Sequence, residues 1–414
     1  MITRVPSKSW SIVYNTICDQ TEWRLYPMDH EECITLMDVF QGIPDPRKAR
    51  GKRYHWLFLL ALIGAALVSG QQTAHAIAHW VSLHGPALHR RLQPPRSSMP
   101  SESTIRRALG DIDITILEQR LTDLAQCLAA TGPQQGTVKT EAGQVLQGQA
   151  LDGKELRGVR AHGQKLHLLS LVQHESGRTL TQMSVETKTN EITAAPELLR
   201  GRDLSSTVTT MDALLTQRPF AQQILDQNGH YLMVVKRNQG NLYDAIAVLF
   251  DDPPWLPREK EAECQVHHSV EKGHGRLEKR TLESSHTLSD YVDWPSVGQV
   301  MRRRYERIRL KTGEVSTATT YGITSLPHTE VRTAGLERLW RGHWTIENRV
   351  HYVRDVTMGE DANQTHTGNA PHVLAALRNA VLNLFRHQGW NNIADAFRHH
   401  NASVNRALTL IGAV

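Results

Sequence analysis

The sequence predicts an α/β protein in which an all-helical N-terminal region precedes a mixed sheet with flanking helices. Three observations support this expectation. Apolar residues recur at helical spacing over roughly the first third of the 414 residues. After Gly132, short apolar runs bounded by Gly-containing turns alternate with helical patterns. A second strand-rich stretch then precedes the last helices, and a chain of this length can bury several hydrophobic cores.

Helical patterns fill residues 31–132, after an N-terminal arm over residues 1–30 that has no firm periodicity. The longest apolar run, Trp56 to Val68, would form a helix of about 20 Å, too short to cross the roughly 30 Å of bilayer hydrocarbon. We therefore expect a buried helix there and no membrane association. The expected helices of this region begin near Glu31 and cover residues 54–69, 71–84, 101–109 and 113–130.

Residues 133–250 carry the order β-β-β-α-β-α-β-α, which is typical of a ribonuclease H-like mixed sheet with helices on its faces. The expected strands are 148–156, 165–174, 180–188, 207–212 and 231–236, and the helices are 192–200, 218–227 and 242–250.

Residues 251–326 predict an antiparallel β-rich insertion before the last catalytic helix. Residues 327–390 would complete the catalytic domain, with one helix opened by Pro327 and another with Pro371 in its first turn. Residues 391–414 are expected to form a C-terminal helical tail. The expected strands of the insertion are 264–270, 276–282, 299–310 and 317–323.

Positive charge is concentrated in two stretches of a chain whose net charge is +5. Residues 41–110 contain ten Lys and Arg against two acids, and residues 302–311 contain six against Glu306. Such stretches are typical of polyanion binders, although any solvated face can be basic. The helical region is thus either a DNA-binding module or a cap that packs on the rest. Its candidate DNA contacts are Arg47, Lys48, Arg50, Lys52, Arg53, Arg106 and Arg107.

Four cysteines lie far apart and form no Cys-x-x-Cys pair. This spacing argues against a structural zinc site or a disulfide scaffold and favours a reducing compartment. The first fourteen residues contain no apolar core of the kind that a signal peptide needs. We therefore expect a cytoplasmic protein, associated with the bacterial nucleoid if it binds DNA.

The segment 339–355 gathers aromatic, basic and acidic residues at helical spacing. One interpretation is a buried amphipathic helix whose polar members are paired. The other is a rigid helix that presents Glu347 to a metal ion and its neighbours to a ligand. The residues on this stripe are Trp340, His343, Trp344, Glu347, His351, Arg354 and Asp355.

Two aspartates lie where the predicted sheet would present ligands. Asp152 is in the first strand and Asp212 ends the fourth, so both would meet at one place if these strands were neighbours. Glu347 would supply a third carboxylate. Three carboxylates without Cys or His suit Mg²⁺ or Mn²⁺, and two such ions can support in-line phosphoryl transfer. From spacing alone, Asp203 or Asp226 would serve equally well.

Several short motifs follow one another along the chain. They are LDGKELRG (151–158), KTNEITAAPELL (188–199), MDA (211–213) with LMVVKRNQ (232–239), and RGHWTIEN (341–348) continuing to TGNAP (367–371). IPDPR (43–47) and PSESTIRR (100–107) precede them. Together they resemble the DDE transposases of bacterial insertion sequences, specifically the ISAs1 family, related to the IS4-type and H-repeat-associated proteins. The resemblance covers roughly residues 31–390.

The resemblance implies that Asp152, Asp212 and Glu347 are the acidic triad that binds divalent metals for DNA cleavage and strand transfer. IS4-type proteins carry Tyr, Arg and Lys around their glutamate, whereas the same spacing here has Trp340, His343 and Arg354. Aromatic and basic character is kept although the residue identities differ. Further candidate DNA contacts are Lys154 and Lys236 beside the aspartates, and Trp344 and His351 on the glutamate stripe.

We therefore expect a DNA transposase that hydrolyses a phosphodiester at the transposon ends and joins the 3′-hydroxyl to target DNA. Its cofactor would be Mg²⁺ or Mn²⁺, with two ions per active site. Its partners would be double-stranded DNA, as terminal inverted repeats and target, and a second copy of the chain when two ends are paired. The alternatives are a domesticated DNA-binding protein without chemistry and a plain nuclease that cuts without joining.

Overall fold

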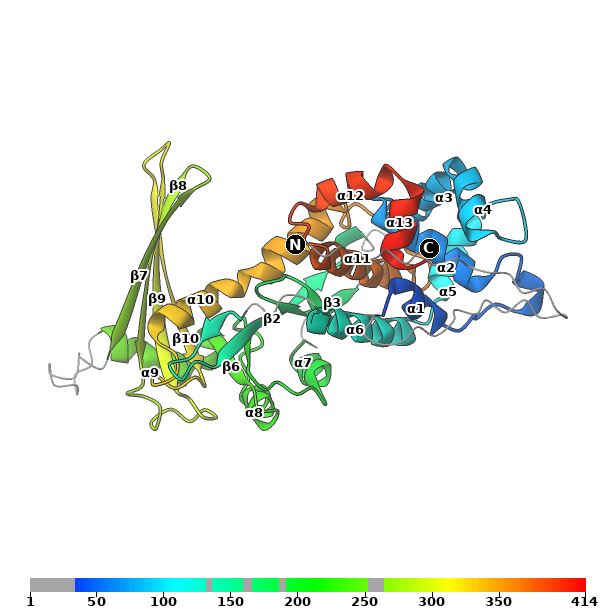
Figure 1. Cartoon of the computed structure of the whole chain (residues 1–414). Helices are drawn as coiled ribbons and strands as arrows, with labels where there is room; N and C mark the ends of the chain where they lie inside the picture. Colours follow the sequence, from blue (N-terminus) through cyan, green and yellow to red (C-terminus); the bar gives the residue numbers. More distant parts are fainter. Residues whose placement is uncertain (1–33, 132–135, 159–165, 186–190, 252–263) are drawn as a thin grey trace, which may run out of the picture.

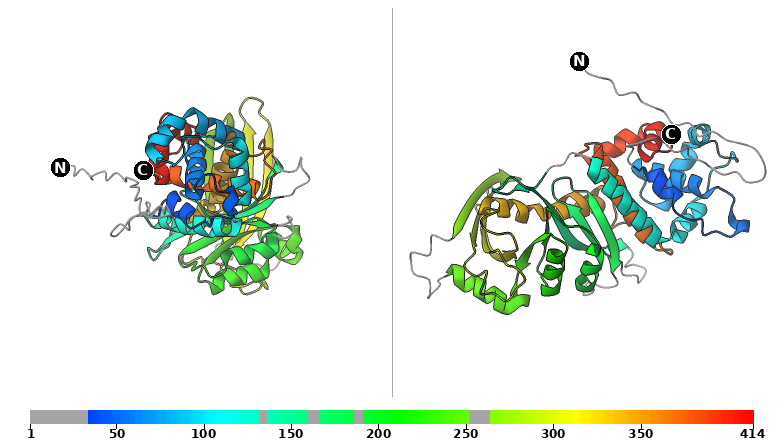
Figure 2. Two further views of the ribbon diagram at one scale, coloured as in Figure 1. Left: turned by 90° about the vertical axis from the view of Figure 1, so that its right-hand side faces the viewer. Right: turned by 60° about the horizontal axis from the view of Figure 1, so that its bottom comes forward.

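The computed structural model describes residues 34–131, 136–158, 166–185, 191–251 and 264–414. The expected arm over residues 1–30 lies outside these ranges. Figure 1 shows a long sheet with helices gathered at one end and a projecting ribbon of strands at the other, and the right-hand view of Figure 2 agrees.

The N-terminal helices form around one almost fully buried apolar helix, α2 (Trp56–Val68). α1 is fixed at its start by a capping box in which Thr35 and Asp38 bond each other's backbone N–H. α4 was not among the expected helices; Pro86 occupies its first turn, where proline is tolerated. The other helices are α1 (Leu36–Gln41), η1 (Ala49–Gly51), α3 (Ala74–Leu83), α4 (Gly85–Leu92), α5 (Glu102–Asp111) and α6 (Ile114–Thr131).

The C-terminal helices complete the same helical body. Side chains of α11 (Ala370–His387), α12 (Ile393–Asn401) and α13 (Val404–Ile411) share one apolar core with α2. The helical body is therefore built from both ends of the chain.

The centre of the molecule is a mixed sheet, as the sequence predicted. β2 pairs antiparallel with β3, which pairs with β4, and β5 and β6 follow parallel to β2. The first and fourth predicted strands, β2 and β5, are therefore neighbours. The strands are β1 (Val138–Lys139), β2 (Val145–Glu155), β3 (His167–Gln173), β4 (Thr179–Val185), β5 (Thr207–Met211) and β6 (His230–Val235).

The four strands expected as an insertion continue this sheet. β10 (Val315–Thr324) pairs antiparallel with β6, in the register Tyr321↔Val235, and the path proceeds through β9, β8 and β7. Ten strands thus form one sheet, with the order β4-β3-β2-β5-β6-β10-β9-β8-β7 and β1 beside β2. The ribbon seen in Figure 1 comprises β7 (Gln265–Gly273), β8 (Arg276–Ser285), β9 (Gln299–Arg309) and β10.

Helices cover both faces of the sheet. α7 (Glu191–Leu199), α8 (Arg218–Asp226) and α9 (Gly240–Asp251) pack on one face through a core that includes Leu151, Met211 and Met233. α10 (Thr333–Gly342) packs on the other face against Leu146 and Leu232. A short turn of helix, η4 (Arg237–Gln239), links β6 to α9.

The glutamate-bearing helix begins later than expected and changes its winding. Arg332, not Pro327, precedes the first helical residue, so the prediction that Pro327 opens this helix is wrong. Beyond α10 the chain continues in π-helical form as η6 (Ile346–His351) and η7 (Val353–Thr357). Gly359 adopts φ +62° just past the end, a conformation that favours glycine.

Cysteine chemistry differs from the expectation. Cys264 is a free thiol, whereas Cys127 is disulfide-bonded, which departs from the reducing setting that the cysteine spacing favoured. Among the described helices, none combines the length and the hydropathy that a bilayer span requires.

Candidate functional site

The parallel pairing of β2 with β5 brings two of the predicted acids together. Leu151 lies opposite Met211, so Asp152 and Asp212 are the next residues on adjacent strands. Asp212 Oδ1 accepts backbone N–H groups from Leu214 at 3.0 Å and Leu215 at 3.2 Å, which fixes its carboxylate at the start of the following turn. The structure therefore brings Asp152 and Asp212 together, as the sequence indicated.

Asp152 is surrounded by other carboxylates. Burial, together with the negative charges of Asp212, Glu191 and Glu347, raises the pKa of Asp152 to about 7. A carboxyl group in this surrounding ionises reluctantly unless a cation is close. Glu347 is one of the three acids that raise this pKa, so the predicted third acid contributes to the same electrostatic site.

Glu347 reaches this place on a rigid support. It lies in η6, which contacts β2, and its own side chain is exposed. Four residues later, His351 Nδ1 lies 3.8 Å from Asp152 Oδ2. Burial and the positive charges of Arg354 and Lys154 lower the pKa of His351 to about 3, so its ring is neutral at physiological pH.

A chain of hydrogen bonds centred on Thr210 of β5 lies next to the acidic site. Thr210 Oγ1 lies 2.9 Å from His174 Nε2 and 3.1 Å from His343 Nδ1, and it donates to the carbonyl of Gln149. Burial lowers the pKa of both histidines, that of His174 to about 3. His343 therefore contacts β5 directly, near Asp212, rather than extending from the surface.

The donor set fits hard divalent cations by its chemistry. Carboxylate oxygens are the ligands that Mg²⁺ and Mn²⁺ prefer, and a cation between these acids would relieve the repulsion that raises the pKa of Asp152. Within the described ranges, no three His, Cys, Asp or Glu side chains are already gathered tightly around one point. Bringing Glu347 into coordination thus requires its exposed side chain to turn toward the aspartates.

Four predicted DNA contacts are instead buried, namely Lys154, Trp340, His351 and Arg354. Arg354 is fully buried and donates to Glu360 at 2.9 Å, so its guanidinium does not reach the surface. Lys154 Nζ bonds Asp355 at 2.7 Å. Trp340 is 4% exposed and covers Gly322, where an added Cβ would lie 2.6 Å from the indole. The structure does not support a phosphate contact for Arg354 or a DNA contact for Trp340.

Other predicted contacts are exposed. Lys236 follows β6 beside the acidic site, and Trp344 is 52% exposed on the glutamate segment. In the N-terminal basic stretch, Arg47 is committed to local structure, because it bonds Asp45 and the Tyr54 carbonyl and lies over the Trp56 ring. The remaining candidate contacts of the helical region are exposed, namely Lys48, Arg50, Lys52, Arg53, Arg106 and Arg107. Two of them have acidic partners, since Lys52 pairs with Asp45 and Arg106 with Glu102.

Reasoning from the sequence missed a buried ion pair beside Asp152. Glu191, at the start of α7, contacts His167 of β3, and both lie against Gly153. A Cβ at Gly153 would overlap both side chains, so this glycine permits their close approach. Glu191 stands within the KTNEITAAPELL motif, which was the one signal that could have pointed to it.

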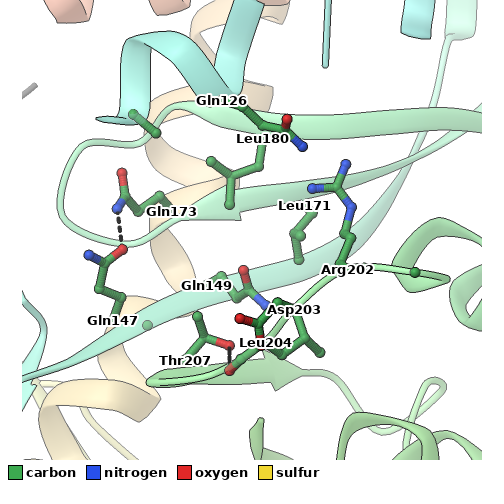
Figure 3. A pocket seen from close by; sticks show the side chains of 13 residues that line it. Gln126, Gln147, Gln149, Leu171, Gln173, Leu180, Arg202, Asp203, Leu204 and Thr207 are labelled. Atoms are coloured by element: carbon green, nitrogen blue, oxygen red, sulfur yellow. Dashed lines mark hydrogen bonds between the residues drawn. The ribbon is translucent and has the colours of Figure 1, made fainter. Parts of the chain in front are cut away.

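The alternative acids Asp203 and Asp226 lie elsewhere. Asp203 lines a cavity of about 380 Å³ at the opposite end of β2. Gln149, Leu171 and Arg202 are among the side chains that line it with Asp203 (Figure 3). Its carboxylate accepts from Ser205, which lowers its pKa. Asp226 is exposed on α8 and bonds Gln222. Geometry thus distinguishes Asp212 from the acids that spacing could not exclude.

Comparison with known proteins gives consistent matches. The family described as "Transposase DDE domain" matches residues 143–384, and the one described as "DDE_Tnp_1-associated" matches residues 37–125. "Putative transposase YncI" of Escherichia coli O157:H7 is 27% identical over 366 residues, 85% of this chain and 87% of that protein. An uncharacterised protein from the dhlA 3′ region of Xanthobacter autotrophicus is 32% identical over 69% of this chain and 92% of its own.

Two further likenesses are more limited. "H repeat-associated putative transposase YhhI" of Escherichia coli K12 is 28% identical over 53% of this chain and 58% of that protein. A piggyBac transposase, solved in a synaptic complex with hairpin DNA, covers 89% of this chain and 75% of its own, with a TM-score of 0.44 and 10% identity. A likeness of that strength carries no argument about mechanism.

Proposed function

The chain belongs to the transposase DDE family, and from this premise we propose that Asp152, Asp212 and Glu347 are its catalytic acids. It is a DNA transposase, an enzyme class that uses divalent metal ions. The proposal assigns the triad to a ribonuclease H-like catalytic core and the chain to the ISAs1 group of insertion-sequence transposases. A single observation carries the assignment. The β2–β5 register sets Asp152 beside Asp212, and the negative charge of Glu347 helps to raise the pKa of Asp152.

Divalent cations held by these acids, Mg²⁺ or Mn²⁺ and two per site, would activate a water or a 3′-hydroxyl and stabilise the leaving oxygen. The protein's own groups prepare this place. Asp152 must lose its proton before it can ligate, and its raised pKa couples ligation to proton release. The neutral His343 keeps its Nδ1 bonded to Thr210, which holds the imidazole against β5.

The proposed reaction is hydrolysis of a phosphodiester at each transposon end, followed by joining of the freed 3′-hydroxyl to target DNA. Exposed cations of the helical body, among them Lys48, Arg50 and Arg53, would contact duplex DNA. Lys236 and Trp344 lie exposed near the acids and would contact the strand being cut. Two copies of the chain would hold two ends during the reaction.

The test is cleavage of duplex DNA carrying the element's own ends, with Mg²⁺ or Mn²⁺ against EDTA, for the wild type and Glu347→Gln. We expect metal-dependent nicking in the wild type and none in the variant, with DNA binding retained by both. Scoring joined products separates a transposase from a plain nuclease. Cleavage by Glu347→Gln at the wild-type rate would refute the triad, and binding without any cleavage by the wild type would favour a domesticated DNA-binding protein.

A further inference from the structure

A second cavity, of about 250 Å³, lies outside the acidic site and is lined by positive charge. It is formed where the β3–β4 turn, η6 and the C-terminal end of α11 meet. The side chains that define it are Arg178, Arg349, Arg386, His387, Trp390 and Glu175. We call this cavity the arginine pocket.

The arginine pocket holds three arginines and one acid, Glu175, whose charge favours the ionised form of Arg349. By contrast, three arginines elsewhere in the described chain have buried acidic partners of their own. Arg354, Arg302 and Arg303 each meet a buried glutamate. In the arginine pocket the one acid is Glu175, which pairs with Arg338 outside it at 3.3 Å.

The guanidinium groups of the pocket donate to backbone carbonyls. Arg349 Nη1 reaches the Glu175 carbonyl at 2.7 Å, and Arg386 donates to the carbonyls of Gly177 and Arg349. Arg178 donates to the Leu128 carbonyl. These bonds orient the cations without neutralising their charge.

Two side-chain nitrogen atoms of the pocket are buried without a hydrogen-bond partner in the described structure, namely Arg178 Nε and His387 Nδ1. Arg178 is 5% exposed. Burial, with the neighbouring charge of Arg349, lowers the pKa of Arg386 to about 9, and burial lowers that of Arg178 and Arg349. Three cations gathered largely out of water around a single carboxylate are costly, and a bound anion would reduce that cost.

The β3–β4 turn is fitted around these cations. Gly177 has φ +65°, and a Cβ there would lie 3.2 Å from both Arg349 Nε and Arg386 Nη1. Trp390 is half-buried at the edge of the pocket, where its indole can contact a base or a sugar next to a bound anion. The pocket therefore combines anion donors with an aromatic platform.

We propose that the arginine pocket binds a backbone phosphate of the DNA substrate. The inference rests on the proposed function and adds a DNA contact outside the triad. Planar guanidinium groups match phosphate oxygens in pairs, which favours phosphate over a simple halide. Gln173, at the pocket, pairs with Gln149, three residues from Asp152 on β2. The pocket thus lies roughly 10 Å along the strand from the triad, within reach of a nearby nucleotide.

The test measures binding of fluorescein-labelled duplex carrying the element's end, in EDTA, at several salt concentrations. Arg349→Gln is the test variant, and Arg338→Gln, on the same side but outside the pocket, is the matched control. We expect the slope of log K against log salt to become shallower by about 0.9 for Arg349→Gln and to stay unchanged for the control. A folded Arg349→Gln protein with the wild-type slope overturns the proposal.

Further arms keep the outcome decisive. If thermal unfolding shows that Arg349→Gln does not fold, His387→Gln replaces it, with a severalfold loss of affinity expected and equal affinity counting against the pocket. Inorganic phosphate that raises the Tm of the wild type while the DNA slope stays unchanged in the variant would assign the pocket to free phosphate and overturn the DNA contact. Absence of DNA binding by the wild type would refute the proposed function itself.

Discussion

Replacing Asp152 by Asn should stabilise the metal-free protein at neutral pH, an unusual outcome for a residue assigned to catalysis. The folded-state pKa of Asp152 is about 7, against an ordinary value of 3.8. The folded protein therefore binds more protons at this site than the unfolded chain between these values, and stability falls as pH rises from about 4 to about 7. Asn cannot ionise, so the variant loses this dependence.

The magnitude follows from the same two values. Each tenfold change in the protonation equilibrium corresponds to about 1.4 kcal/mol, so a pKa raised from 3.8 to about 7 costs about 4 kcal/mol above pH 7. The Asp152 side chain is 32% exposed, and solvent screening reduces this cost to roughly 2 kcal/mol. Bound metal should offset the same cost in the wild type, since a cation favours the ionised carboxylate.

The assay is urea unfolding of wild type and Asp152→Asn in EDTA at pH 5 and pH 8, repeated with Mg²⁺ at pH 8. We expect the variant to exceed the wild type at pH 8 by roughly 2 kcal/mol, with a smaller gap at pH 5. Mg²⁺ should stabilise the wild type alone. Parallel pH curves for the two proteins would show that Asp152 is not held in a repulsive carboxylate cluster, and stabilisation of both by Mg²⁺ would place the metal elsewhere.

Three further outcomes are expected. Arg354→Ala should destabilise the fold by about 3–5 kcal/mol, because it leaves Glu360 buried without this partner; a loss under 1 kcal/mol in chemical unfolding would contradict that role. Gly153→Ala should cost about 1–3 kcal/mol through overlap with the Glu191–His167 pair, and a wild-type Tm would disprove the close contact. Lys236→Gln should make the slope of log K against log salt for DNA binding shallower by about 0.9, whereas Arg47→Gln should mainly lower Tm. A lower Tm for Lys236→Gln and a shallower slope for Arg47→Gln would contradict these roles.

Periodicity and turn chemistry predicted most of the described elements, because their local signals agree with the final packing. α2 was recognised as a buried helix from its apolar run, and the chain order of strands and helices around β2 to β6 was correct. The sequence could not show that β10 pairs with β6, since strand pairing across a long separation leaves no local mark. For the same reason it could not show that α11 to α13 join the core of α2.

The residues of the candidate site likewise include some that the sequence predicted and others that only the fold brings together. Asp152 and Asp212 were recognised as neighbours once strands one and four were assumed adjacent, and the register supports that assumption. Glu191 and His167 were missed because each has an ordinary setting in its own element, and only the fold places them against Gly153. Among the cations, nothing in the sequence separates exposed Lys236 from buried Lys154, since both lie at the C-terminal end of a predicted strand.

The winding of the glutamate segment explains why the predicted stripe failed at Arg354. At α-helical period, Glu347, His351, Arg354 and Asp355 would share one face. In the π-helical form the backbone bonds run i→i+5, so each turn holds about one residue more and the face follows a longer spacing. The charge of Glu347 raises the pKa of Asp152, His351 lies 3.8 Å from Asp152, and Asp355 accepts a hydrogen bond from Lys154. Residues four apart on this segment therefore continue to face β2. Arg354, seven residues after Glu347, points away from β2 and pairs with Glu360. Glu360 also pairs with Arg378 of α11, and these two ion pairs anchor the segment to the helical body. A cation at that spacing therefore supports the site by holding the glutamate segment in place, and a pattern based on an α-helix assigns it to DNA wrongly.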